Sequence, residues 1–380
     1  MNATRITEVV CHPLRALLPT PQRTSQATYA AIEIVVVEVR TGDGLTGWGE
    51  CLARRGASAY AAFIDTVLAP LLVGEDPLDR RRLWNRMRAP LTGRTGGMLI
   101  EAVAGIDIAL WDLAGRIADQ PVVHLLGGIG RPRVAAYASS INWLDDETAD
   151  TEVDAALLAG FRQIKVKLGL PVAAAIVRAR RIRARAGDGI LLGVDANWAY
   201  DVDEAITVGN RLADLGYDFF EEPIRPEDRD GYRRLARALP IRLAAGESDF
   251  TAGDALQSLA DRSVGMIQPD VARAGGITET WRIAELAAAH RTRYAPHVGW
   301  SGALCVAASL QLAAAAEAFW SFECMVYRNP LRQSLTNETV GDASQLVDGE
   351  LPVPMGPGLG VTIDRDRLRD FAITTASGLY

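Results

Sequence analysis

The chain has 380 residues, 49% of them hydrophobic and 23% charged, a composition typical of a globular protein long enough for two domains. Its formal net charge of −7 argues against nucleic acid or an anionic membrane surface as a partner. A small anionic substrate fits better, because a site can be positive within an acidic protein.

The cysteines and the apolar stretches indicate the compartment. The four cysteines are scattered and form no CxxC pair, which fits a reducing environment better than a disulfide scaffold or a zinc site. The first twenty residues lack the pattern of a signal peptide. The most apolar long stretch, residues 303–316, is too short to span a bilayer. We therefore expect a cytoplasmic protein with no membrane partner.

The N-terminal third predicts an α+β unit. Residues 31–40 are rich in β-branched side chains and are followed by the turn Gly42-Asp43-Gly44 and a second run at 45–50, a pattern typical of an antiparallel hairpin. Between residues 68 and 117, apolar side chains recur at helical spacing. A sheet followed by helices is the pattern of an α+β unit.

Beyond residue 130, short apolar strands alternate with helical patterns. Eight strands are expected, at residues 134–137, 161–167, 190–194, 217–220, 241–245, 264–267, 293–296 and 319–322. Such alternation implies parallel strands joined by right-handed crossovers, and eight in a row favour a closed α/β barrel over an open sheet. The segment after residue 350 is rich in proline and glycine and is expected to return across the surface.

The chain contains only two lysines, Lys165 and Lys167; the other 38 of its 40 basic residues are arginines. On an extended strand the two lysines share one face. Arginine keeps its proton in proteins, whereas lysine can be tuned by its surroundings to act as a base. Next to a second ammonium group and a divalent cation, a lysine pKa is expected to fall, which makes Lys167 the candidate base.

From the second barrel strand onward, each strand ends on a residue capable of chemistry. In chain order these are Lys165 and Lys167, Asp195 with Asn197, Glu221, Glu247, Asp270, His297 and Glu323. Starting at Lys167, they follow one another at intervals of 23 to 28 residues, one strand–helix unit each. The spacing places them together at the C-terminal mouth of the barrel, where such barrels keep their active sites.

The acidic residues and the histidine suggest specific chemistry. Asp195, Glu221 and Glu247 are expected to converge, and three buried anions repel one another unless a cation lies among them. Oxygen ligands favour a hard ion, so we expect Mg²⁺, with Mn²⁺ as the alternative. Asp270, one strand before His297, is placed to accept a hydrogen bond from one imidazole nitrogen and leave the other as a base.

The motifs resemble the enolase superfamily, specifically its mandelate racemase subgroup, over nearly the whole chain. The resemblance rests on Lys165-Val166-Lys167, Asp195-Ala196-Asn197, Glu221-Glu222-Pro223, Gly246-Glu247, Gln268-Pro269-Asp270, Pro296-His297 and Glu323. It implies a (β/α)₇β barrel at residues 131–350. It also implies an α+β capping domain at 1–130, to which the C-terminal segment, 351–380, returns.

The resemblance also implies roles for these residues. The metal ligands would be Asp195, Glu221 and Glu247; the catalytic residues Lys167, His297, Asp270, Lys165 and Glu323; and the substrate contacts Asn197, Lys165, Glu323 and Arg54. Lys167 would be the base on one face of the substrate, and the His297–Asp270 pair would act on the opposite face. Glu323 would hydrogen-bond the carboxylate oxygen that gains charge, and Lys165 would support both base and carboxylate.

The implied reaction begins with removal of the proton α to a carboxylate. The expected outcome is dehydration of a sugar acid, an aldonate or aldarate, to a 2-keto-3-deoxy acid. Racemisation or epimerisation of an α-hydroxy acid, and cycloisomerisation of a sugar-acid lactone, are the alternatives, and residues 105–112 are similar to the lactone enzymes. The expected cap loops, 19–28 and 51–56, are polar, which favours a polyhydroxylated substrate.

Two other classes fit less well. The sister subgroup of muconate-type cycloisomerases and dipeptide epimerases needs a base lysine on the sixth strand, where this chain has Asp270. A non-catalytic protein on the same fold would have lost ligands or bases, and none is missing here. We expect the enzyme to be a homo-oligomer.

Overall fold

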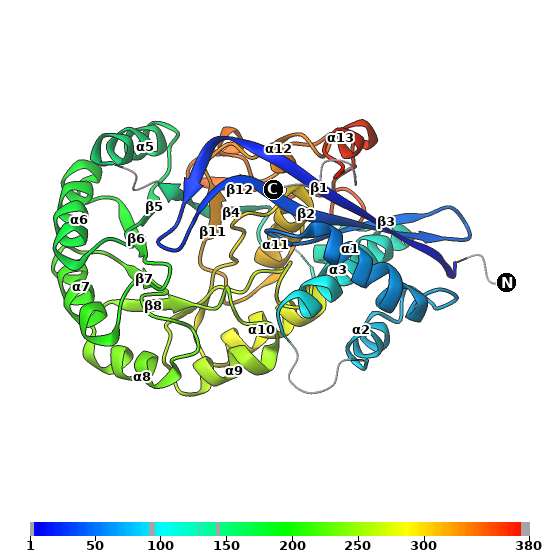
Figure 1. Cartoon of the computed structure of the whole chain (residues 1–380), viewed down its shortest axis with the longest axis horizontal. Coiled ribbons are helices and arrows are strands. Elements are labelled where there is room, and N and C mark those ends of the chain that lie inside the picture. Colours follow the sequence, from blue (N-terminus) through cyan, green and yellow to red (C-terminus); the bar gives the residue numbers. More distant parts are fainter. Residues whose placement is uncertain (1–3, 91–95, 129, 142–144, 374–380) are drawn as a thin grey trace.

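The computed structural model describes residues 4–90, 96–128, 130–141 and 145–373, which form a sheet-and-helix unit beside a barrel (Figure 1). The N-terminal sheet is antiparallel and has the strand order β1 (Ile6–Arg23), β2 (Thr28–Thr41), β3 (Thr46–Cys51). The hairpin expected from the sequence is β2 and β3. The sequence did not predict β1, because its prolines interrupt a strand pattern; as an edge strand it tolerates them.

Helices cover one face of this sheet. They are α1 (Ala57–Phe63), the π-helical turn η1 (Ile64–Leu68), the 3₁₀ turn η2 (Ala69–Leu71), α2 (Arg80–Arg88), α3 (Met98–Ala118) and α4 (Val122–Leu125). The apolar spacing predicted α3, which packs tightly on β3. A Cβ added at Gly49 would lie 2.0 Å from the carbonyl oxygen of Gly105, so only glycine allows this approach.

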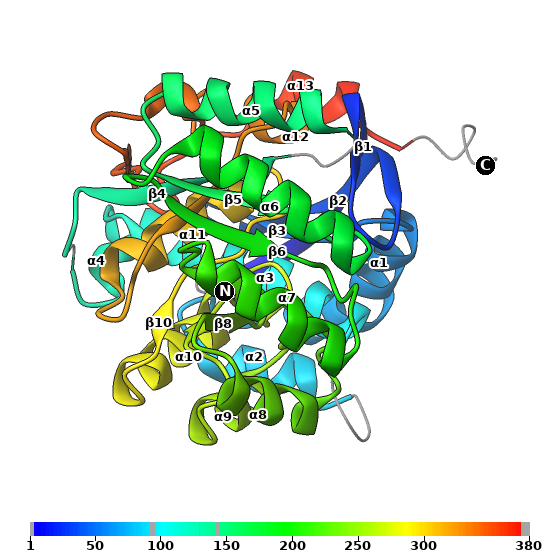
Figure 2. The same ribbon diagram turned by 90° about the vertical axis from the view of Figure 1, so that its left-hand side faces the viewer.

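The second unit is the predicted (β/α)₇β barrel, whose outer helices face the viewer in Figure 2. Its strands are β4 (Arg133–Ile141), β5 (Gln163–Lys167), β6 (Leu191–Asp195), β7 (Phe219–Glu221), β8 (Arg242–Ala245), β9 (Met266–Ile267), β10 (Arg293–Tyr294) and β11 (Phe322–Met325). The intervening helices are α5 (Asp146–Leu158), α6 (Val172–Ala186), α7 (Val202–Asp214), α8 (Arg229–Ala238), α9 (Ala252–Ala260), α10 (Ile277–Ala289) and α11 (Ala303–Ala315). Neighbouring strands are parallel, and a parallel bridge between Tyr294 and Phe319 closes the ring.

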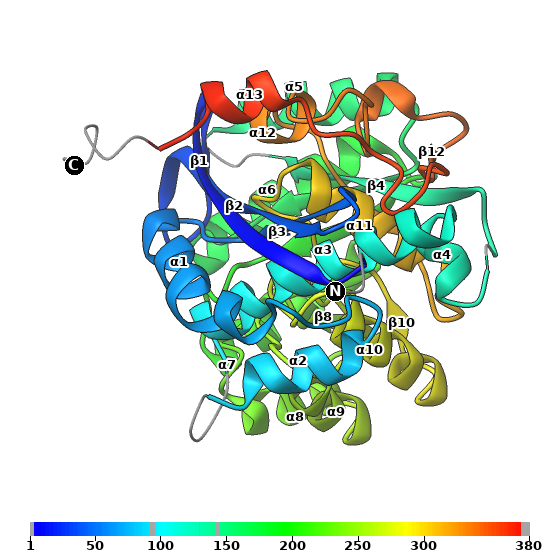
Figure 3. The same cartoon turned by 90° about the vertical axis from the view of Figure 1, so that its right-hand side faces the viewer.

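The chain after the barrel runs back to the N-terminal sheet. Its elements are α12 (Pro330–Gln333), η3 (Ala343–Gln345), β12 (Glu350–Pro352), which pairs with β4, and α13 (Arg365–Asp370). Figure 3 shows α13 beside β1. The amide of Ile373 donates to the carbonyl of Pro13 at 2.9 Å, and Arg365 pairs with the buried Glu38 of β2 at 2.6 Å.

Two buried carboxylates of the N-terminal unit hold helices of the barrel. Glu50, on β3, accepts hydrogen bonds from the amides of Gly302 (2.6 Å) and Cys305 at the start of α11. Asp107, on α3, accepts from the amide (2.8 Å) and hydroxyl of Thr278 at the start of α10. Helix N-termini leave amides unpaired, so a carboxylate there fixes the helix. α10 and α11 follow the strands that lead to Asp270 and His297, so these contacts position that side of the barrel mouth.

Candidate active site

Lys165 is buried between two carboxylates. Its Nζ lies 2.7 Å from Oε1 of Glu221 and 2.7 Å from Oε1 of Glu323, and the residue is 1% exposed. Burial alone lowers the pKa of Lys165, but these carboxylates raise it well above its usual value. Lys165 therefore carries a fixed positive charge at the floor of the site.

Lys167 points toward the next strand. Its ammonium group pairs with Oδ2 of Asp195, the residue opposite it in the parallel register of β5 and β6. Burial lowers the pKa of Lys167, and Asp195 raises it by more, so the net direction is upward. The expectation of a lowered lysine pKa is therefore wrong for the protein by itself, because each lysine has a carboxylate partner that outweighs the second ammonium group.

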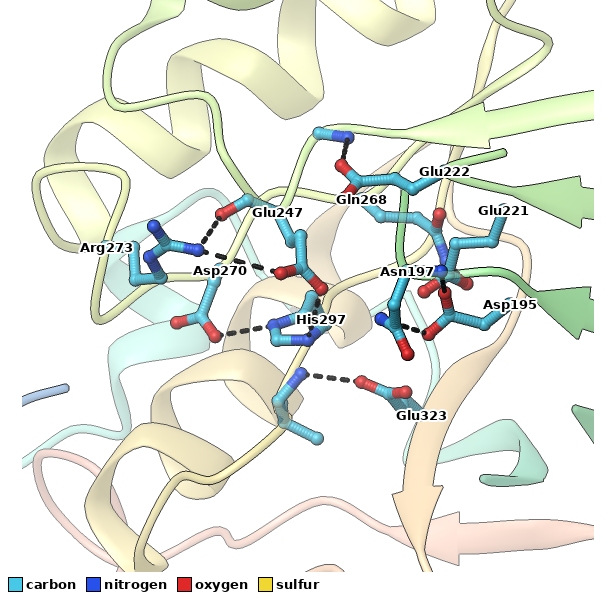
Figure 4. A network of polar contacts seen from close by, with 12 residues as sticks. Asp195, Asn197, Glu221, Glu222, Glu247, Gln268, Asp270, Arg273, His297 and Glu323 are labelled. Atoms are coloured by element: carbon cyan, nitrogen blue, oxygen red, sulfur yellow. Dashed lines mark hydrogen bonds and ion pairs between the residues drawn. The ribbon is translucent and has the colours of Figure 1, made fainter. Parts of the chain in front are cut away.

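The hydrogen bond expected between Asp270 and His297 is present (Figure 4). Nδ1 of His297 lies 2.7 Å from Oδ2 of Asp270, and its Nε2 lies 3.0 Å from Oε2 of Glu247. Burial lowers the pKa of His297, but Glu247 and Glu323 raise it well above its usual value. The imidazole is thus held at both nitrogens, and Asp270 fixes its orientation.

Asp195, Glu221 and Glu247 do not converge as expected. Among the described residues no group of three or more His, Cys, Asp or Glu side chains lies close enough together to hold a metal ion. The reason is that each carboxylate has turned to a protein cation: Asp195 to Lys167, Glu221 to Lys165, and Glu247 to His297. Figure 4 shows Asp195 and Glu221 on one side of the site and Glu247 on the other.

The same three residues nevertheless suit a hard divalent cation in chemistry and placement. All three are buried, at the mouth of consecutive strands, and Asp195 and Glu221 are direct neighbours in the register of β6 and β7. Three buried carboxylates supply the oxygen-only donors that Mg²⁺ prefers. Their present partners are side chains that can rotate away.

Glu323 is fixed by contacts on both of its oxygens. Oε1 accepts a hydrogen bond from the hydroxyl of Ser139 at 2.6 Å, and Oε2 accepts one from the amide of Val298 at 2.9 Å. Burial raises the pKa of Glu323, but the neighbouring Lys165 and His297 hold it well below its usual range. In this form Glu323 is an acceptor, so positive charge toward a substrate carboxylate must come from its cationic neighbours.

Sequence reasoning missed several residues that hold this arrangement. Ser139 is one, and Gln268, whose Nε2 donates to Glu221 at 2.7 Å, is another. Arg273 donates to the carbonyl oxygen of Glu247 and to Oε1 of Glu101, both at 2.9 Å. A polar residue two positions before Asp270 on the same strand was the available signal for Gln268. The position of Arg273, in the turn after the strand, gave none.

A cavity of about 470 Å³ opens among these groups. It is lined by Thr24, Gln26, Tyr29, Arg54, Ser140, Lys167, Asn197, Trp198, Glu247, His297, Gly299, Trp300, Glu323 and Met325. The expected substrate contacts Asn197, Glu323 and Arg54 are thus on its wall, whereas Lys165 is not among the lining residues. The polar cap loops contribute as expected, but three aromatic side chains, which the sequence did not predict, share the lining.

The tip of the β1–β2 hairpin is attached to the barrel beside Asp195. The carbonyl oxygen of Asn197 accepts hydrogen bonds from Oγ of Ser25 (2.5 Å) and Nε2 of Gln26 (2.9 Å). The amide of Asn197 donates to Oδ1 of Asp195 at 2.8 Å. Asn197 therefore joins the cap to the metal-ligand candidate.

Strained backbone surrounds the cavity. Five of its lining residues have positive φ although they are not glycine: Arg54, Ser140, Asn197, Trp198 and Trp300. Such conformations cost about 1–3 kcal/mol each and persist where the fold needs a side chain to point in one direction.

Fold and site together define a class: barrel enzymes that remove the proton α to a carboxylate. The chain belongs to the mandelate racemase/muconate lactonizing enzyme family, whose N-terminal domain matches residues 5–127, while an enolase C-terminal domain-like region matches residues 148–367. The resemblance to the enolase superfamily is therefore confirmed, and the protein is an enzyme of the lyase or isomerase type. Enolase superfamily enzymes use Mg²⁺.

Individual relatives narrow the comparison. The chain is 35% identical to the D-galactarolactone cycloisomerase of Agrobacterium fabrum, over 97% of this chain and 98% of that protein. It is 35% identical to the arabinonate dehydratase of Saccharolobus solfataricus, over 87% and 88% of the two chains. The structure matches a racemase from Streptomyces coelicolor A3(2) with bound magnesium, with a TM-score of 0.89 and 29% identity, covering 97% of this chain and all of that one. No helix in the described part of the chain is both long and apolar enough to cross a membrane.

Proposed function

We propose that the enzyme removes the α-proton of a sugar acid and expels the β-hydroxyl, giving a 2-keto-3-deoxy acid. One observation carries the proposal: two proton-transfer candidates, Lys167 and His297, line the same cavity. They come from strands three positions apart around the eight-stranded ring, so they approach a bound molecule from different sides. A dehydratase needs one group to take a proton and another to give one to the leaving hydroxyl.

Mg²⁺, or Mn²⁺, held by Asp195, Glu221 and Glu247 would polarise the substrate carboxylate and stabilise the charge of the deprotonated acid. Lys167 would take the α-proton once its ammonium group leaves Asp195 and loses its own proton. His297, kept in one orientation by Asp270, would deliver a proton from Nε2 to the departing oxygen. Lys165 would act from behind, by fixing the carboxylates of Glu221 and Glu323 and by adding positive charge.

The substrate is proposed to be a small polyhydroxylated anion. Thr24, Gln26 and Asn197 supply hydroxyl and amide groups to the cavity wall, and Arg54 supplies a cation. Such groups suit the hydroxyls and charge of a sugar acid. Cytoplasmic location and homo-oligomerisation stay predictions; light scattering on the purified protein measures the second.

The test uses aldonates, aldarates and their lactones incubated with the protein and Mg²⁺ in D₂O. Formation of a 2-keto-3-deoxy acid supports dehydration, while exchange of the α-proton without elimination indicates racemisation. Lys167→Met and His297→Asn serve as the matched variants. If both variants exchange and turn over every accepted substrate at the wild-type rate, the two-residue mechanism is wrong.

Lactone cycloisomerisation is the second candidate. It is supported by the relative from Agrobacterium fabrum, whose similarity extends over 97% of this chain. The chemistry starts with the same proton removal, and the leaving group is then the ring oxygen instead of a hydroxyl. Release of an open-chain acid from a lactone, with one deuterium incorporated and no water lost, distinguishes it from dehydration.

A further inference from the structure

Arg54 holds an unusual position in the cavity. It lies in the segment between β3 and α1, with φ +54°, and lines the cavity together with Lys167 and His297. A non-glycine residue in this left-handed conformation is costly unless its side chain is needed in a particular direction. Here that direction is toward the cavity.

The guanidinium of Arg54 is also poorly matched by the protein. Its described polar contact is a single one, from Nη2 to Oε1 of Glu247, at the long distance of 3.4 Å. Glu247 already has closer partners, since His297 lies 3.0 Å from its side chain and Arg273 donates to its carbonyl oxygen. Nε of Arg54 is buried and has no hydrogen-bond partner in the part of the chain that the structure describes.

The other cations at the site differ in this respect. Lys165 is shared by two carboxylates at 2.7 Å, and Lys167 pairs with Asp195. Arg273 has Glu101 at 2.9 Å. Leaving buried donors unpaired costs about 1–3 kcal/mol, so the spare donors of Arg54 suit a ligand that supplies acceptors.

We propose that Arg54 binds a second carboxylate at the end of the substrate away from the reacting carbon. The substrate class is then a sugar diacid or its monolactone, and not a monoacid. The planar guanidinium can hold a carboxylate through two parallel hydrogen bonds, which the hydroxymethyl end of a monoacid does not offer. The inference rests on the proposed function, which assigns the first carboxylate to the reacting end.

Charge recognition can be tested apart from catalysis with two inert ligands, adipate and hexanoate. Both have six carbons and no hydroxyl to expel, and they differ in the second carboxylate. In Mg²⁺ buffer, calorimetry should show at least tenfold tighter binding of adipate by the wild type. Arg54→Gln should remove the difference, whereas Arg55→Gln, a neighbour that stacks on Tyr29 and is not among the cavity-lining residues, should keep it.

Turnover provides the second arm. We expect Arg54→Gln to lower kcat/KM for galactarate and its lactone at least 100-fold and to change that for galactonate less than fivefold, with Arg54→Lys between. Equal losses on both substrates, equal binding of adipate and hexanoate, or a wild-type preference for monoacids would overturn the inference. If adipate selectivity depends on Arg54 but no sugar acid exchanges its α-proton, the proposed function fails and the diacid site stands.

Discussion

Nδ1 of His297 lies 2.7 Å from Oδ2 of Asp270, and the same two residues form a parallel backbone bridge. The side-chain contact is thus fixed by the pairing of the strand ends. Asp270 is fully buried and also accepts the amide of Ala272 at 2.9 Å, so its own orientation is set. This geometry holds the imidazole in one tautomer and stabilises its protonated form.

Asp270→Asn should therefore impair the step that His297 performs while leaving the fold intact. We expect a fall in kcat of about 10²–10⁴-fold, the range for loss of a positioned acid or base. Exchange of the α-proton by Lys167 should persist. Product formation and deuterium exchange, measured on the same samples, separate the two steps, and equal losses in both would contradict the assignment.

Lys165→Met should be strongly destabilising. It leaves Glu221 and Glu323 buried without their shared cation, and breaking a buried ion pair costs about 3–5 kcal/mol in the free energy of unfolding. Urea denaturation measures the change. Adding Glu323→Gln to the same chain should recover part of the loss; a double variant no more stable than Lys165→Met would show that charge is not the cause.

Mg²⁺ should stabilise the protein through Asp195, Glu221 and Glu247. Saturation at 100 times the dissociation constant would add about 2.7 kcal/mol, visible as a rise in Tm. Glu221→Gln should abolish this rise. Glu222→Gln is the matched control, because the Glu222 side chain accepts from the amide of Gly246 and from Trp198. A control that loses the Mg²⁺ effect as completely as Glu221→Gln would refute this ligand set.

Asp107 should make stability depend on pH. Burial raises the pKa of Asp107 to about 7, while Thr278 and Arg80 oppose the rise and Glu279 adds to it. Between about pH 4 and 7 the folded state then binds more protons than the unfolded chain, so stability falls as pH rises, by up to about 1.4 kcal/mol per pH unit. Asp107→Asn should gain stability relative to the wild type across this range in urea titrations. Parallel pH profiles for the two proteins would exclude the effect.

The rings of Tyr29 and Trp300 should hold the hairpin tip over the cavity. Their centroids are 4.4 Å apart, and they join the cap to the loop after His297. An aromatic pair contributes about 0.5–1.5 kcal/mol beyond buried area. Trp300→Leu should raise KM up to about tenfold with little change in kcat, and Trp300→Phe should restore most of the loss. A fall in kcat alone would instead place Trp300 in the chemical step.

The barrel and the residues at its mouth were predictable because parallel strand–helix units repeat. Intervals of 23 to 28 residues between Lys167 and Glu323 place each side chain at the same edge of the ring. The edge strand β1 was not predictable from local pattern, since its prolines are tolerated only because β2 pairs with one side of it.

The sequence alone therefore determined which chemical groups this protein brings to its active site and in what order around the barrel. Only the tertiary structure decided their partners. Lys165 lies between Glu221 and Glu323, Lys167 meets Asp195, and Arg54 keeps unused donors. The physical reason is distance: strand spacing follows from chain periodicity, but ion pairs and pKa directions depend on separations of a few ångströms, which barrel closure and cap docking set.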